Sequence, residues 1–256
     1  MNKVMLPGTG LKISRLAFGT GSLHHLKTGR QRQHILASAA DLGFSHFDTS
    51  PYYGFGIAER ELSEFLSCHS LNLTVASKFG LYPPGGRPHG DWEVLIRKLA
   101  GRILPSLSRP LIDWSLAAAE HSLTHSLRVL HRDWIDILFL HEPLTSTLDA
   151  DFWAGWLEKQ RKAGKIRYWG LAGRVARFAV WLDHPIAQVV QIQDGADMLE
   201  LQRRGRVPQL TYGALSQAKD KPLAALHSAL QRNLSGGLLI SSRSASHLAQ
   251  LVQAVG

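Results

Sequence analysis

The sequence predicts a single α/β domain in which eight parallel strands close into a (β/α)8 barrel, covering residues 1–256. Two observations predict this fold: short apolar runs alternate with amphipathic helical patterns along the whole chain, and eight such units fit into its length. Barrels of this kind typically need about 250 residues. An open, doubly wound sheet is the structural alternative, but no strand is followed by the G-x-G-x-x-G turn of a dinucleotide-binding sheet. The closed barrel therefore accounts better for the pattern.

The elements can be predicted in order. Residues 4–14 hold a Pro-Gly and a Thr-Gly between apolar residues, which predicts a short N-terminal hairpin at the bottom of the barrel. Strands are predicted at 15–21, 44–50, 73–80, 134–141, 166–173, 187–194, 208–215 and 236–242. Helices are predicted near 30–42, 57–68, 115–131, 150–163, 174–183, 196–205, 222–233 and 244–254. The helix at 150–163 follows Asp149 as N-cap and ends at Gly164. The Pro- and Gly-rich segment 81–92 is predicted to be a long loop.

The charge of the chain is strongly positive, with a formal net value of +9. Its basic residues are scattered, and the local groups at 30–34, 158–167 and 201–206 lie in helical or loop contexts. Solvated helix faces explain these groups best; a basic field that attracts anionic cofactors or substrates is the second interpretation, and a nucleic-acid groove the third. No zinc-finger or RNA-binding motif supports the third. We therefore expect no nucleic-acid partner.

Cellular location is indicated by two further features. Cys68 is the only cysteine, so no intrachain disulfide can form, which fits a reducing compartment. No apolar run reaches 18 residues, and the first residues lack the apolar core of a signal peptide. The prediction is a cytoplasmic protein without a membrane partner, either a monomer or a weak homo-oligomer.

Polar residues end three consecutive predicted strands. Asp48 ends the second strand, Lys78 the third and His141 the fourth, and Tyr53 lies five residues beyond Asp48. Taken singly, the aspartate is explained by helix capping, the lysine by a surface position and the histidine by a hydrogen-bonded core position. Because the carboxyl ends of barrel strands meet at one rim, the four side chains are predicted to converge there. Burying any one of them alone would cost several kcal/mol, whereas together they can neutralise one another.

This set of side chains suits the reduction of a carbonyl group. A tyrosine with its ordinary pKa near 10 is a poor acid or base at neutral pH. We expect Lys78 to stabilise the phenolate of Tyr53 and so lower its pKa, and Asp48 to hold the lysine in place. Tyr53 would then act as general acid in reduction and as general base in oxidation. His141 would orient the substrate oxygen.

Three stretches resemble the aldo-keto reductase superfamily: DTSPYYGFGIAERELSEFL, VASKFG and SLRVLHRDWIDILFLHEP. The resemblance implies a (β/α)8 TIM barrel with a catalytic tetrad of Asp48, Tyr53, Lys78 and His141, and it selects Tyr53 over its neighbour Tyr52. The wording DTSPYYG is closest to the branch of sugar and aldose dehydrogenases. It implies a nicotinamide cofactor and a small carbonyl or sugar substrate.

The resemblance also implies cofactor contacts in the second half of the chain. Gln191 would hold the nicotinamide carboxamide and Tyr212 would stack on the ring. The cofactor phosphates would be bound by Ser242, Arg243 and His247, near the N-terminus of the last helix.

Further contacts are predicted from the loops of the barrel mouth. The glycine-rich turn after the first strand permits a close approach of backbone to ligand, so Gly19 and Thr20 are also predicted at the cofactor, although the glycines can equally just shape the turn. Candidate substrate contacts are His24, Tyr52 and Glu142; Glu142 can alternatively pair with an arginine.

Three positions, in two places, depart from the family pattern. Ala172 and Gly173 replace a Ser-Asn pair that would hold the carboxamide, and Ser241 replaces a lysine next to the phosphate site. Arg243 is then the best candidate for a 2′-phosphate, and NADP(H) is favoured over NAD(H). The family's long C-terminal substrate loop has no counterpart, so a more open pocket, or one closed by segment 81–92, is expected.

The predicted function is an oxidoreductase that moves a hydride between a nicotinamide cofactor and an aldehyde, ketone or sugar hydroxyl. The alternative is a barrel of the same family with weakened cofactor binding, acting as a binding or regulatory protein. A metal-dependent hydrolase would need a ligand cluster; His121 and His125 stand four apart on a helix without a third ligand, so no metal site is predicted.

Overall fold

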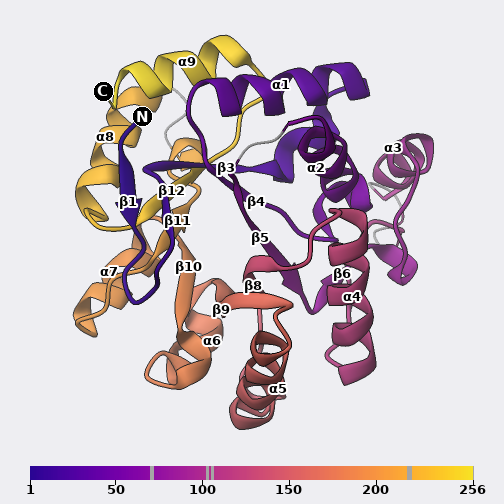
Figure 1. Ribbon diagram of the computed structural model, residues 1–256, viewed down its shortest axis with the longest axis vertical. Coiled ribbons are helices and arrows are strands. Elements are labelled where there is room, and N and C mark those ends of the chain that lie inside the picture. Colours follow the sequence, from indigo (N-terminus) through magenta and orange to yellow (C-terminus); the bar gives the residue numbers. More distant parts are fainter. Residues whose placement is uncertain (70–71, 102–103, 105–106, 218–220, 256) are drawn as a thin grey trace.

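Eight parallel strands close into one barrel in the computed structural model, which describes residues 1–69, 72–101, 104, 107–217 and 221–255 (Figure 1). Their order around the barrel follows the chain, and the last strand pairs in parallel with the first. The strands are β3 (Leu16–Gly19), β4 (His46–Asp48), β5 (Thr74–Phe79), β8 (Ile135–His141), β9 (Ile166–Gly173), β10 (Val189–Gln193), β11 (Leu210–Tyr212) and β12 (Gly237–Ile240). The predicted barrel and all eight of its strands are confirmed.

Helices surround the barrel and bury their apolar faces against it (Figure 1). They are α1 (Gly29–Asp41), α2 (Ile57–Cys68), α4 (Leu116–Val129), α5 (Ala150–Lys162), α6 (Val175–Phe178), α7 (Ala196–Arg203), α8 (Pro222–Arg232) and α9 (Ala245–Gln253). The cap prediction for α5 is confirmed, since the Asp149 carboxylate accepts two backbone N–H groups and Gly164 follows with φ +75°. The predicted helix 174–183 is shorter than expected, because Phe178 leaves helical geometry (φ −135°, ψ 18°) and only a 3₁₀ turn follows.

The N-terminal hairpin closes the bottom of the barrel. Its strands β1 (Lys3–Met5) and β2 (Lys12–Ser14) pair antiparallel and lie across one end of the barrel (Figure 1). Leu6, Leu11 and Ile13 are buried in the same apolar cluster as residues of the barrel interior. The predicted hairpin is confirmed, and it leaves the opposite end, where the strands terminate, for ligands.

Segment 81–92 is not the simple loop that was predicted. It holds β6 (Leu81–Tyr82), which pairs antiparallel with β7 (Leu111–Ile112), followed by a 3₁₀ turn and the start of an unpredicted helix, α3 (Asp91–Ala100). The prolines and glycines that suggested a loop fall in the 3₁₀ turn and its flanks, whereas the pairing partner of β6 lies 30 residues further on. The sequence pattern reveals the local periodicity of a helix or strand, but it does not reveal which distant strand pairs with it.

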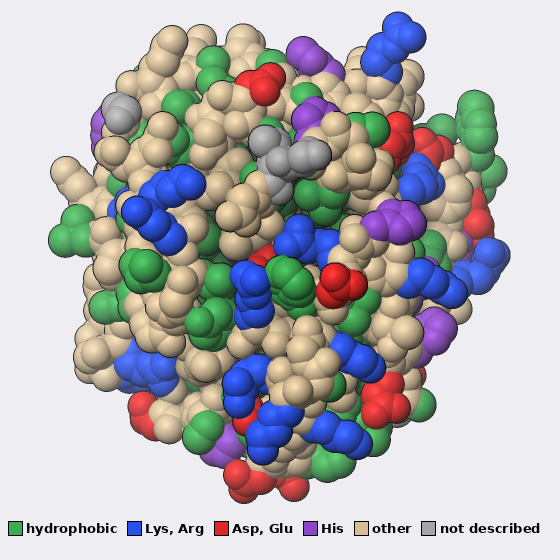
Figure 2. Space-filling view, in the orientation of Figure 1, with side chains coloured by type: hydrophobic (Ala, Val, Ile, Leu, Met, Phe, Trp, Pro, Cys, Tyr) green, Lys and Arg blue, Asp and Glu red, His purple; other side chains and the backbone are tan. Residues whose placement is uncertain are grey.

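Basic side chains are spread over the hairpin face and interspersed with acidic ones (Figure 2). Several are paired: Arg161 bonds Glu158, and Arg167 bonds the buried carboxylate of Asp136. This supports the interpretation of the basic groups as solvated faces. Within the described ranges, every helix is too short or too polar to cross a membrane.

Candidate active site

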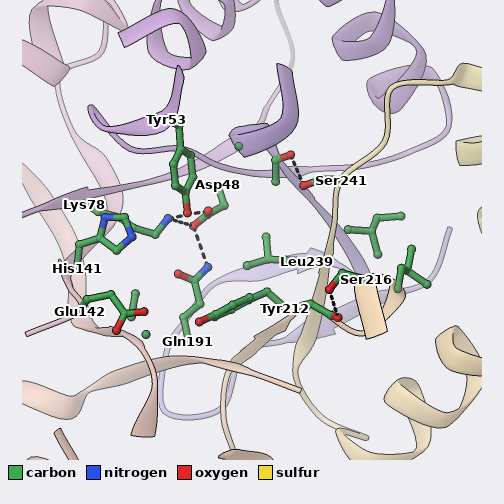
Figure 3. A pocket seen from close by; sticks show the side chains of 17 residues that line it. Asp48, Tyr53, Lys78, His141, Glu142, Gln191, Tyr212, Ser216, Leu239 and Ser241 are labelled. Carbon is green, nitrogen blue, oxygen red and sulfur yellow. Dashed lines mark hydrogen bonds and ion pairs between the residues drawn. The ribbon is translucent and has the colours of Figure 1, made fainter. Parts of the chain in front are cut away.

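A trough of about 430 Å³ opens at the C-terminal ends of the barrel strands. Asp48, Tyr53, Lys78 and His141 all line it, so the structure brings together the four residues predicted to converge (Figure 3). The sequence places Asp48 and His141 at the last positions of their strands and Lys78 one residue before the end of its own. Parallel pairing then brings the strand ends to the same rim.

Tyr53 reaches the trough because of a tight turn directly behind it. Gly54, Phe55 and Gly56 all have positive φ (58°, 56° and 97°), and α2 begins at the next residue. At Gly54 a Cβ would lie 2.6 Å from the Cβ of His24, so only glycine fits this close approach. The turn reverses the chain and leaves the tyrosine ring over the barrel mouth.

Lys78 and Asp48 form a fully buried ion pair. The ammonium lies 2.6 Å from both carboxylate oxygens of Asp48 and donates to the carbonyl oxygen of Thr49 at 3.0 Å. The amide of Gln191 donates a further bond of 2.8 Å to the same carboxylate. Burial lowers the pKa of Lys78, while the attraction of Asp48 opposes that shift. The pair is therefore held by several bonds in a dry environment.

The expected acidification of Tyr53 is wrong. Lys78 Nζ lies 4.9 Å from the centroid of the tyrosine ring, but its charge is balanced by Asp48. Burial raises the pKa of Tyr53 well above its ordinary value, and the Asp48 charge raises it further. The phenol is thus protonated at neutral pH.

His141 meets Tyr53 edge-on, with ring centroids 5.8 Å apart and planes at 85°. Burial lowers the pKa of His141 well below its ordinary value, and the positive charge of Lys78 lowers it further. The imidazole is therefore neutral at pH 7. Ser50 Oγ lies 3.4 Å from its Nδ1 and fixes the ring from the side. This serine was missed, although it stands in the same DTSP stretch as Asp48.

We expect acid to weaken the fold through buried histidines. Burial lowers the pKa of His46 to about 4, and His141 shifts in the same direction. In the folded protein both histidines stay neutral, whereas in the unfolded chain they bind a proton below about pH 6.5. Their contribution to the free energy of unfolding is therefore complete above that pH and is lost as the pH falls toward the folded pKa. His46 should remove about 2 kcal/mol of unfolding free energy between pH 7 and pH 5, and His141 should add to that loss. Urea unfolding at both pH values measures this.

The variant His46→Gln is the control for that loss. It has no imidazole to protonate, so its free energy of unfolding should fall by about 2 kcal/mol less than that of the wild type over the same interval. Equal losses in the two proteins would show that His46 does not carry the acid sensitivity.

Glu142 lines the trough beside His141 but is already paired. Arg177 Nε lies 3.3 Å from its carboxylate, and the backbone N–H of Arg174 donates to the same group at 3.4 Å. A Cβ on Gly173 would lie 2.6 Å from the carboxyl carbon of Glu142, and Gly173 has φ +144°. Glycine at that position therefore makes room for the Glu142 carboxylate.

Three other predicted contacts lie outside the trough. His24 and Tyr52 line a neighbouring cavity of about 310 Å³ that touches the other side of Tyr53. Thr20 is fully buried, and its hydroxyl donates to the carbonyl oxygen of Asp48 at 2.9 Å. The structure thus places Thr20 behind the site as a support. Segment 81–92 contributes no residue to the described lining of the trough and leaves it open.

The remaining predicted cofactor residues lie along one continuous hollow. Gln191 and Tyr212 line the trough itself (Figure 3). Gly19 lines it as well. A wider cavity of about 890 Å³ adjoins it, since both are lined by Leu215, Ser216 and Ser241.

The wider cavity carries the phosphate residues that were predicted. Ser242, Arg243 and His247 line it at the start of α9. Lys27 and His25 from the first strand–helix connection also line it and were missed, because sequence spacing does not show that this loop faces α9. Basic side chains therefore surround this end of the hollow.

Metal ligands do not cluster in the part of the chain that the structure describes: it holds no group of three or more His, Cys, Asp or Glu residues placed to bind a metal ion. His121 and His125 stack their rings at 6.1 Å on α4.

Reactive side chains at the C-terminal strand ends of a closed barrel are typical of (β/α)8 barrel enzymes, whose active sites lie at that face. A model of the aldo/keto reductase family matches residues 15–231, so this chain belongs to that family. The chain is 30% identical over 181 residues to D-threo-aldose 1-dehydrogenase from a Pseudomonas species, covering 65% of this chain and 52% of that protein. It is 28% identical to L-galactose dehydrogenase of Arabidopsis thaliana, covering 66% and 47%. The inferred family and its sugar dehydrogenase branch are confirmed, and the chain spans about half the length of these relatives.

Solved structures agree with the barrel. An aldo-keto reductase from Bacillus halodurans in its holo form superposes with a TM-score of 0.78 and 20% identity, covering 100% of this chain and 91% of that one. A glycerol dehydrogenase from Gluconobacter oxydans gives a TM-score of 0.76 and 19% identity, covering 99% and 90%. At these identities the likeness concerns the fold.

Proposed function

We propose that this protein is an NAD(P)-dependent oxidoreductase that interconverts an aldehyde or ketone and an alcohol, with sugars as the favoured substrate class. The observation that carries the proposal is the buried Lys78–Asp48 pair with Tyr53 and His141 beside it, in a trough that continues into a basic cavity. Membership of the aldo/keto reductase family supports it. The names of the two sugar dehydrogenases that it resembles support the substrate class.

The hollow fits an extended dinucleotide. The nicotinamide supplies or accepts the hydride when it is bound. The Tyr212 ring forms one wall of the trough and offers a surface for stacking, and the side chain of Gln191 offers hydrogen bonds to a carboxamide. Ser242, Arg243 and His247 would bind phosphate at the other end.

Tyr53 would donate its proton to the carbonyl oxygen during reduction. Its raised pKa keeps the phenol protonated, which favours that direction at neutral pH. The neutral imidazole of His141 would hold the same oxygen by a hydrogen bond. Alcohol oxidation needs the deprotonated phenol, so its rate should rise with pH while reduction persists into the alkaline range.

The binding-protein alternative draws on Ala172 and Gly173, which lack side chains for a carboxamide. We do not favour it. The trough is open to a cofactor, and the space that a side chain at position 173 would occupy is filled by the Glu142 carboxylate, so the missing side chain does not mark a lost site. We also place the protein in the cytoplasm, since its one cysteine is free and exposed, as suits a reducing compartment.

NADP(H) should bind more tightly than NAD(H), through Arg243. Replacing this arginine by alanine removes a charge-assisted bond to the 2′-phosphate and should raise the dissociation constant of NADPH about tenfold, while that of NADH changes less than about twofold. Titration of the wild type and the variant with each cofactor, followed by nicotinamide fluorescence, measures this.

The control is Arg203→Ala, which removes an exposed arginine on α7 that lines none of these cavities. It should leave both dissociation constants unchanged. The assignment of Arg243 would be wrong if its variant lost NADPH and NADH affinity equally. Failure of the wild type to bind either cofactor would contradict the proposed function itself.

A further inference from the structure

A second cavity of about 310 Å³ lies outside the barrel, between α2, α4 and the β6 connection. It shares no lining residue with the trough. Its walls are largely apolar, and the apolar lining residues are Pro51, Pro83, Pro88, Leu111, Ala118 and Val129. Its volume and apolar lining with a few polar groups are those of a small-molecule site.

A buried carboxylate forms part of this cavity. Glu59 is only 2% exposed, and its Oε1 accepts hydrogen bonds of 2.8 Å from the hydroxyls of Ser77 and Ser126. Both of these bonds end on the same oxygen, and among the described residues no hydrogen bond reaches the second oxygen, Oε2. Because Glu59 lines the cavity, a ligand bound there can donate a hydrogen bond to this oxygen.

The nearby basic side chains are engaged elsewhere. Arg60 contacts Asp91 at 2.5 Å and Glu61 at 3.3 Å. The ring of His89 lies between the carbonyl oxygen of Pro84 and the carboxylate of Glu93, at 2.7 and 2.8 Å. Neither contacts Glu59, so its Oε2 remains accessible to a ligand. Burial raises the pKa of Glu59, and the hydrogen bonds from Ser77 and Ser126 and the charge of Lys78 oppose that shift.

The same cavity offers a ligand flat side-chain surfaces and one further polar atom. The hydroxyl of Tyr82 is buried in the cavity wall, with the backbone of Gly80 and the side chain of Ser122 beside it. On the α4 side, the rings of His121 and His125 are almost parallel, with 13° between their planes. These rings and the prolines that also line the cavity offer flat surfaces to a planar ligand body.

We propose that this cavity binds a small planar aromatic cation, such as an aryl amidine or aryl amine, whose charged group bonds to Glu59 and whose ring packs between the prolines and α4. The amidinium would donate to Oε2 of Glu59 in a charge-assisted bond. The Tyr82 hydroxyl accepts a second N–H or donates to a substituent. Because the site shares no residue with the trough, the proposal stands independently of the proposed oxidoreductase activity.

Benzamidine is the probe that tests this, measured by isothermal titration calorimetry on the whole protein. It should bind with a dissociation constant of about 1 mM or tighter, and the neutral isostere benzamide and the anion benzoate should bind at least about tenfold more weakly. Glu59→Gln keeps the shape and an acceptor for the serines but removes the charge, and it should weaken benzamidine at least about tenfold.

Two further variants locate the binding. Ala118→Phe fills the cavity from α4, leaves Glu59 unchanged and should abolish binding. It keeps the proposal testable if Glu59→Gln fails to fold. Glu142→Gln neutralises the carboxylate of the trough and should leave benzamidine affinity unchanged. The proposal is overturned if benzamidine does not bind, if benzamide binds equally well, if Ala118→Phe retains affinity, or if Glu142→Gln loses it.

Discussion

Tyr53→Phe should lower kcat for carbonyl reduction by about 10²–10⁴-fold, because it removes the proton donor and almost nothing else. The ring would keep its edge contact with His141 and its place over Lys78. The dissociation constant of the cofactor should therefore change little. Steady-state oxidation of reduced cofactor with saturating aldehyde measures kcat, and fluorescence titration measures the affinity.

Tyr52→Phe is the matched control for that experiment. Tyr52 is the adjacent residue, but it lines the neighbouring cavity and not the trough. Its variant should retain kcat within about threefold, since it removes a hydroxyl that does not reach the reacting atoms. A large loss in Tyr52→Phe, with activity kept in Tyr53→Phe, would show that the roles of the two tyrosines are exchanged.

Lys78→Met should destabilise the fold by about 3–5 kcal/mol, because it leaves the Asp48 carboxylate buried without its cation. The pair is almost completely inaccessible, with side-chain exposures of 2% and 4%. Urea unfolding at pH 7 measures the free energy. Activity should fall as well, since the ammonium also fixes the surroundings of Tyr53.

The double variant Asp48→Asn, Lys78→Met is the control for the buried charge. Without either charge the desolvation cost disappears, so the double variant should recover part of the stability that Lys78→Met loses. Gln191 can still donate to the carbonyl oxygen of an asparagine at position 48. Asp48→Asn alone completes the comparison. If the loss of unfolding free energy in the double variant equalled the sum of the losses in Lys78→Met and Asp48→Asn, the view that the two groups stabilise one another would be contradicted.

The barrel and the convergence of the four polar side chains were accessible from the sequence because both follow from local periodicity and parallel topology. Strand ends of a parallel barrel must meet, so residues as distant as Asp48 and His141 are placed at one rim by their positions in their strands. Cap residues such as Asp149 act within one turn and were predicted for the same reason.

The direction of the Tyr53 pKa shift was not accessible in this way. It depends on which charge dominates in three dimensions, and the bond between Lys78 and Asp48 neutralises the cation that the sequence suggested. The Glu59 cavity was missed for a similar reason. It is formed by elements that pack around β6, whose pairing across 30 residues has no local signature.

The most direct test of the central claim is the absorbance of the reduced nicotinamide during turnover by the unmodified protein. Aldehydes are offered with NADPH, and aldoses separately with NADP⁺. We expect saturable turnover in at least one direction, with reduction maintained into alkaline pH and oxidation rising with pH, and loss of that turnover in Tyr53→Phe. Equal rates in the wild type and Tyr53→Phe, or no turnover although the cofactor binds, would contradict it.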